Sequence, residues 1–91
     1  MEFEWNPDKA DLNLRKHNIS FHEATTIFND SLSVTFPDPD HSIGEERYVI
    51  IGMSELGKLL IVSHTDRENR IRIITARTAN RQEKRFYEEG S

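Results

Sequence analysis

Residues 64–81 read HTDRENRIRIITARTANR, and this stretch decides how the second half of the chain folds. Charged and apolar side chains alternate from Arg70 to Ile73, and the run of residues 70–77 is typical of a β-strand. The polar residues 66–69 predict a tight turn from a preceding strand at 58–65. Thr78 is a residue type that commonly caps a helix, and we expect a helix to follow it. The stretch therefore predicts an antiparallel hairpin that leads into a C-terminal helix.

The upstream sequence alternates between helix and strand signals. Asn6-Pro7 is a good helix start, Asn18 suits a left-handed helix end, and Ser20 with Glu23 matches a capping box. Two prolines and a glycine make residues 37–44 a loop. The predicted elements are a strand at 2–5, helices at 7–17 and 21–28, and strands at 32–36 and 46–53.

This order predicts an α+β fold in which an antiparallel sheet carries two N-terminal helices and one C-terminal helix. The length of 91 residues predicts one domain, residues 1–91. In the first helix Ala10, Leu14 and His17 share a face, which we expect to be buried. In the strand at 32–36 we expect Leu32, Val34 and Phe36 to point inward.

Composition limits the kinds of site that the chain can hold. The chain has no cysteine, so it offers neither disulfides nor thiolate metal ligands. His17 and His22 lack the spacing of a zinc pair on one helix, and we expect no metal and no cofactor. The longest aliphatic run, residues 59–62, is too short to span a membrane. We therefore expect a soluble, cytoplasmic protein that does not act at a membrane.

Positive charge gathers in one segment of an otherwise acidic protein. The net charge is −4, yet residues 67–85 hold seven of the twelve Lys and Arg residues and only two acids. Most of the seven are arginines, whose planar guanidinium group suits bidentate contact with phosphate. A cationic surface of this kind predicts an anionic ligand.

Three residues in or next to this segment are candidates for catalysis of RNA cleavage: His64, Arg72 and Arg77. Cleavage without metal needs a base for the ribose 2′-hydroxyl and cations for the crowded phosphorane. His64 titrates near neutral pH and can move a proton. The alternative is a structural histidine at a strand end. Strand alternation places Arg70 and Arg72 on one side of the strand and Arg77 on the other, so the arginines are not expected to meet at one phosphate.

A second set of cations is predicted to bind RNA around these residues. Arg81, Lys84 and Arg85 are neighbours on one face of the last helix. They extend a phosphate-binding surface or, alternatively, form a solvated helix face. Lys9 lies on the first helix among acidic residues, where a solvated face is the competing interpretation.

Several short motifs together resemble the BrnT-type toxins of bacterial type II toxin–antitoxin modules, over roughly residues 3–89. The motifs are Phe3-Glu-Trp5, Asp8-Lys9, Asn13-Leu-Arg-Lys-His17, Phe21-His-Glu-Ala24, Phe36-Pro-Asp38, Glu46-Arg47, His64-Thr65, Arg67, Arg72-Ile-Ile74, Ala76-Arg77 and Arg81. The resemblance implies a RelE-like fold and a ribonuclease that arrests translation. It also implies neutralisation by a ribbon-helix-helix antitoxin of the BrnA type. Operator DNA would then be bound only by the toxin–antitoxin complex.

On the matching positions the resemblance implies that Arg67, Arg72 and Arg77 contact phosphate or the transition state, and that His64 transfers a proton. Lys9 and Glu46 follow as further candidates. Two functions are compatible with these residues. The first is a metal-independent endoribonuclease toxin. The second is a non-catalytic interaction module, such as a decayed toxin, that binds an antitoxin and contributes to operator binding and autorepression.

Overall fold

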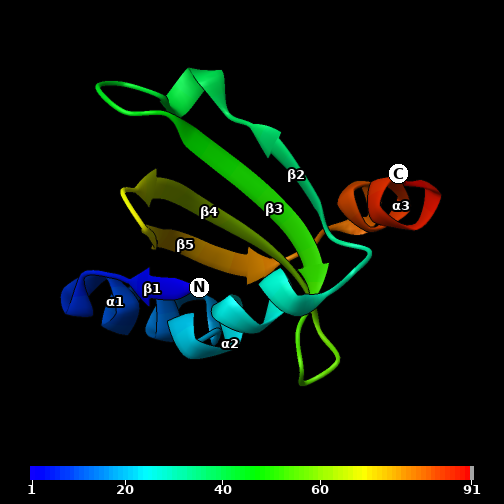
Figure 1. Cartoon of the computed structure of the whole chain (residues 1–91). Helices are drawn as coiled ribbons and strands as arrows, with labels where there is room; N and C mark the ends of the chain where they lie inside the picture. The colour runs from blue at the N-terminus through cyan, green and yellow to red at the C-terminus, as the bar shows by residue number, and fades with distance from the viewer. Residues whose placement is uncertain (91) are drawn as a thin grey trace.

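Five strands form one sheet in the order β1-β5-β4-β3-β2 in the computed structural model, which describes residues 1–90 (Figure 1). Ser91, the last residue of the predicted domain, lies outside the described residues. The strands are β1 (Glu2–Glu4), β2 (Val34–Pro37), β3 (Arg47–Met53), β4 (Leu59–Arg67) and β5 (Arg70–Thr78).

The sheet is mixed, so the prediction of an antiparallel sheet is wrong at one edge. β2, β3, β4 and β5 pair antiparallel in turn, but β1 pairs parallel with β5. Side-chain alternation is the same for either strand direction, and the direction of a three-residue strand is set by the helices that follow it. The sequence pattern of residues 2–5 therefore carried no information about this pairing.

Three helices accompany the sheet, with short 3₁₀ turns at Ile27–Asn29 and Pro39–His41. They are α1 (Pro7–His17), α2 (Phe21–Thr26) and α3 (Arg81–Glu89). The predicted bounds of α1 are confirmed: the Asn6 side chain caps its N-terminus, and Asn18 ends it with φ of 58°. Within residues 1–90, none of these helices is long and apolar enough to cross a membrane.

The starts of the other two helices differ in part from prediction. The Ser20 hydroxyl accepts the Glu23 amide, but the Glu23 carboxylate accepts the Ser54 hydroxyl at 2.7 Å instead of completing a capping box. Asn80, not Thr78, caps α3, because β5 continues through Thr78. Asn80 and Glu83 form a complete capping box at that end.

The helices lie on opposite faces of the sheet. We call the face covered by α1 and α2 the inner face, and the other the outer face (Figure 1). The main core fills the inner face and contains Ile19, Phe21, Ala24, Ile27, Ile50, Leu60, Val62, Ile73 and Ala76. On the outer face, α3 packs Phe86 against Phe36, with ring centroids 5.9 Å apart. Away from α3, no helix within residues 1–90 covers the outer face (Figure 1).

Two predicted apolar faces are wrong in detail. In α1 the buried residue is Asn13, whereas Leu14 is 46% exposed and His17 is also exposed. The strand predicted at 32–36 begins only at Val34, and Leu32 is 68% exposed. Asp30 accounts for this late start, because its carboxylate accepts the Leu32 amide and holds a turn there.

A β-bulge in β5 changes which residues share a face. The register pairs Ser63 with Thr75 and His64 with Ile73, so Ile74 is an extra residue without a partner. An inserted residue shifts the alternation of side chains by one position. Ile73 and Ala76 consequently both reach the inner core although they are three residues apart.

The side chain of Asn13 completes the edge of β5 just beyond this bulge. β1 pairs with β5 only as far as Arg72, which leaves later backbone groups without a strand partner. The Asn13 amide donates to the Ala76 carbonyl at 2.8 Å and accepts from the Ala76 amide at 3.1 Å. It also donates to the Ile19 carbonyl at 3.0 Å. One buried side chain therefore ties α1, the loop before α2 and β5 together.

Replacement of Asn13 by alanine should lower the free energy of unfolding by about 3 kcal/mol, because buried backbone groups lose their partners. Urea denaturation measures this change. Leu14→Ala, on the same helix but half exposed, is the control and should cost less than about 1 kcal/mol. Equal losses in the two variants would contradict the anchoring role of Asn13.

Candidate active site

A row of four polar side chains crosses the outer face. Arg47 of β3 lies opposite Thr65 of β4, Thr65 lies opposite Arg72 of β5, and Arg72 lies opposite Glu4 of β1. Residues directly opposite each other in paired strands point to the same side of the sheet. The row therefore places Arg47 and Arg72 on either side of Thr65.

Arg77 lies on this same outer face. It is opposite Ile61, which is opposite Ile51 beneath α3. Between this row and the Thr65 row lie Ser63 and Thr75, two hydroxyl-bearing residues that are opposite each other in β4 and β5. The two rows are four residues apart along β4, or about 13 Å.

The bulge corrects the predicted facing of the arginines. Simple alternation put Arg72 and Arg77 on opposite sides of β5, but the unpaired Ile74 lies between them and turns Arg77 back to the outer face. The structure thus brings Arg72 and Arg77 to one surface, along with Arg67 and Arg70 at the hairpin end.

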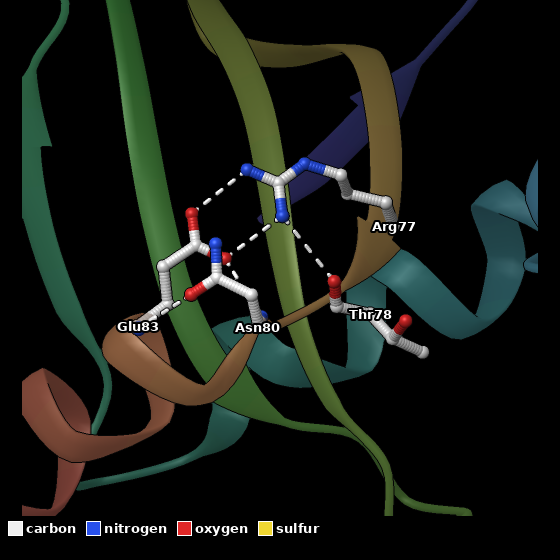
Figure 2. A network of polar contacts seen from close by, with 4 residues as sticks. All are labelled: Arg77, Thr78, Asn80 and Glu83. Atoms are coloured by element: carbon white, nitrogen blue, oxygen red, sulfur yellow. Dashed lines mark hydrogen bonds and ion pairs between the residues drawn. The ribbon is translucent and has the colours of Figure 1, made fainter.

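Arg77 is held by a bidentate ion pair from α3. Its two terminal nitrogens each lie 2.8 Å from a Glu83 carboxylate oxygen, and one also donates to the Thr78 carbonyl at 3.3 Å (Figure 2). The Glu83 carboxylate also accepts the Asn80 amide in the capping box. The hydrogen bond from Arg77 lowers the pKa of Glu83, so this carboxylate is ionised at neutral pH.

Glu4 pairs with two arginines at the other end of the surface. Arg72 donates to its carboxylate at 2.8 Å, and Arg70 lies 3.6 Å from the other oxygen. The hydrogen bond from Arg72 lowers the pKa of Glu4. Arg67 pairs with Glu45 at 3.3 Å, and both groups are well exposed. Most of the positive charge of the arginines in residues 67–77 is thus neutralised by carboxylates of the same chain.

His64 is not brought together with these arginines. It lies next to Thr65 in β4 and so points to the inner face, where its side chain is 6% exposed. Its ring stacks with Tyr48 at 5.7 Å and meets Phe28 edge-on at 5.1 Å. Burial lowers the pKa of His64, and neither ring nitrogen has a hydrogen-bond partner in the part of the chain that is described.

The other predicted RNA contacts lie outside the arginine rows. Arg81, Lys84 and Arg85 are exposed on α3, which carries Glu83 toward the sheet. Lys9 is exposed on α1, where it lines a shallow pocket with Lys16, His17 and Thr75 at the free edge of β5. No cluster of three or more His, Cys, Asp or Glu within residues 1–90 is arranged to hold a metal ion.

Sequence reasoning missed Arg47 and the two carboxylates Glu4 and Glu83 as members of this surface. Arg47 stands outside the cationic segment, and only its strand pairing with β4 brings it near Arg72. Glu4 lies in the predicted strand at 2–5, but its ion pair with Arg72 spans 68 residues of sequence. Of these three residues, only Glu83 has a recognisable sequence pattern: it stands three residues after the helix cap Asn80, as the acid of a capping box does.

Taken together, the fold is α+β with a cationic, hydroxyl-bearing surface on the open face of a five-stranded mixed sheet. The family model for the ribonuclease toxin BrnT of type II toxin–antitoxin systems matches residues 5–83. The chain belongs to this family of ribonuclease toxins. Its toxin class implies an antitoxin partner.

A solved structure shows the same fold. The crystal structure of the Brucella abortus ribonuclease toxin BrnT, at 1.1 Å resolution, is similar with a TM-score of 0.70. The two chains are 19% identical, and the match covers 89% of this chain and 99% of the other. No curated protein matched the sequence.

The ion pair between Arg77 and Glu83 should make stability depend on acid pH. Because the pKa of Glu83 is lowered from 4.5, its contribution is present above pH 4.5 and is lost as the pH falls through the folded-state value. Glu83→Gln retains a cap acceptor but not the charge. It should lower the melting temperature at pH 7, by an amount equivalent to less than about 1 kcal/mol because the pair is partly exposed, and by progressively less as the pH falls below 4.5.

Melting curves of wild type and Glu83→Gln across this pH range measure the effect. Glu88→Gln, at an exposed position on the same helix, removes the same charge and serves as the control. A Glu83→Gln difference that stays constant down to pH 3 would rule out the ion pair as its source.

Proposed function

We propose that this chain is a metal-independent endoribonuclease whose active site is the outer face of the sheet. The observation that supports this most directly is the placement of Arg72 and Arg77 on one open surface, with Ser63 and Thr75 between them. Guanidinium groups stabilise the charge that develops on a phosphorane. Family membership supports the substrate class, because the family is one of ribonuclease toxins.

The chemistry proposed is transesterification within one ribose phosphate. The 2′-oxygen attacks phosphorus and forms a new P–O bond while the bond to the 5′-oxygen breaks, which leaves a 2′,3′-cyclic phosphate. A base takes the 2′-hydroxyl proton, and the departing 5′-oxygen gains one from solvent. In this scheme Arg77 neutralises the phosphorane, and Arg72 holds a neighbouring phosphate of the same strand.

Glu83 is the base that this arrangement favours. It lies 2.8 Å from Arg77 and is ionised. A phosphate that takes one nitrogen of Arg77 weakens the ion pair, and the pKa of Glu83 then rises toward that of an ordinary carboxylate. The base is thereby released next to the bound substrate. His64 lies on the inner face, so we assign it to packing in this proposal.

The biological role proposed is arrest of translation by RNA cleavage in the cytoplasm. The partner proposed is a ribbon-helix-helix antitoxin of the BrnA type, as the sequence resemblance implies. A net charge of −4 disfavours DNA binding by the chain alone. Operator DNA is therefore proposed to bind only the toxin–antitoxin complex.

Cleavage of an unstructured RNA by the purified chain in excess EDTA tests the proposal. Wild type should produce 2′,3′-cyclic phosphate ends, and Arg72→Ala or Arg77→Ala should reduce the rate about 100-fold or more. Arg15→Ala removes the same charge from the exposed face of α1 and should change the rate little. No cleavage by folded wild type, with or without ribosomes, would favour the non-catalytic interaction module.

His64→Phe tests the assignment of His64 to packing. Phenylalanine keeps the aromatic contacts with Phe28 and Tyr48 and removes both ring nitrogens. The variant should cleave RNA at close to the wild-type rate under the same conditions. Loss of cleavage from a folded His64→Phe protein would instead make His64 a proton-transfer group.

A further inference from the structure

Arg47 differs from the other arginines of the outer face in having no carboxylate partner. Arg70 and Arg72 share Glu4, Arg67 pairs with Glu45, and Arg77 pairs with Glu83. Within residues 1–90, no carboxylate lies within ion-pair distance of the Arg47 guanidinium. Among the described residues, Arg47 is therefore the outer-face arginine that has no ion-pair partner.

The nearest acids in sequence are held elsewhere. Glu45 faces Arg67, with 3.3 Å between the charged atoms. Glu46 accepts the Tyr48 hydroxyl at 2.7 Å. The backbone around Arg47 is fixed as well: its amide donates to the Ser42 hydroxyl, and its carbonyl accepts the Asp38 amide. The Arg47 backbone is thus fixed by hydrogen bonds, and its side chain has no counterion among residues 1–90.

One nitrogen of Arg47 is buried and unsatisfied. Its Nε atom has no hydrogen-bond partner among the described residues, although the side chain as a whole is only half-buried. A buried N–H without an acceptor is costly, and such groups often mark a place that a ligand completes. The Nε–H and a terminal N–H of arginine form a fork that fits two oxygens of a phosphate.

We propose that Arg47 and Arg72 form a phosphate subsite across Thr65, and that its ligand is a backbone phosphodiester of single-stranded RNA. The two arginines lie two strand spacings apart, about 10 Å, on one face. The Thr65 hydroxyl donates to the Glu46 carbonyl at 2.7 Å, and this hydrogen bond fixes the Thr65 side chain between the two arginines. This inference rests on the proposed function and names a binding contact that it did not include.

The ion pairs of the outer face favour one order in which the two arginines bind a phosphate. Arg47 meets the phosphate first, because it has no ion pair to break. Arg72 then turns from Glu4 to the same phosphate, and Arg70 remains near Glu4 at 3.6 Å as its counterion. Glu4 therefore keeps a positively charged partner throughout. Arg47 thereby anchors RNA in the row that lies about 13 Å from Arg77.

Binding of an uncleavable RNA tests the subsite independently of catalysis. The probe is a short fluorescent single-stranded RNA with 2′-O-methyl riboses, and fluorescence anisotropy gives the affinity over a range of salt concentrations. Arg47→Ala should bind at least about tenfold more weakly, because one charged contact is lost. It should also lower the slope of log affinity against log salt by about 0.7.

The control is Arg15→Ala, which makes the same change in net charge on exposed α1. It should leave the salt slope unchanged and alter affinity less than twofold. Arg47→Lys keeps the charge but removes the fork, and it should recover the slope with only part of the affinity. Near-ultraviolet circular dichroism of each variant establishes that it is folded.

Equal binding by folded Arg47→Ala and Arg15→Ala would overturn the subsite. Binding does not depend on cleavage, so this result differs from failure of the proposed function. Absence of cleavage by wild type, with RNA binding that still depends on Arg47, would contradict the ribonuclease mechanism while supporting the subsite.

Discussion

The β-bulge at Ile74 is the constraint on which the outer face depends. Without it, strand alternation would send Arg77 to the inner face, where the core packs against α1 and α2. The bulge lets Ile73 and Ala76 both reach that core while Arg72 and Arg77 both face outward. Asn13 holds the register just past the bulge by pairing with both backbone groups of Ala76. The packing of α1 and the composition of the candidate site are therefore linked.

The resting charges of the outer face explain how an acidic protein can carry this surface. Arg70 and Arg72 share Glu4, and Arg77 is paired with Glu83, so the arginines are held in place without exposing a large positive charge. A phosphate that binds Arg72 or Arg77 replaces a carboxylate as the partner of that arginine. Such exchange favours ligands that offer bidentate oxygens and disfavours weak contacts.

Much of the fold could be predicted from local sequence, but the site could not. The bounds of α1 follow from Asn6-Pro7 and Asn18, because caps act within a few residues. The parallel pairing of β1 and the burial of Asn13 depend on contacts that are distant in sequence. The facing of Arg77 depended on a bulge that no residue type announces, and Arg47 entered the site only through its pairing with β4. The burial of His64 could not be predicted for the same reason, because its ring packs against Phe28 and Tyr48, which are distant in sequence.

The measurement that tests this account most directly is an NMR titration of the folded chain with uncleavable single-stranded RNA, following the arginine Nε–Hε signals and the His64 ring. The account predicts large shifts for Arg47, Arg72 and Arg77, which share the outer face, and small shifts for Arg15 and for the His64 ring. Large shifts at His64 with unchanged outer-face arginines would contradict it and place the RNA on the other side of the sheet.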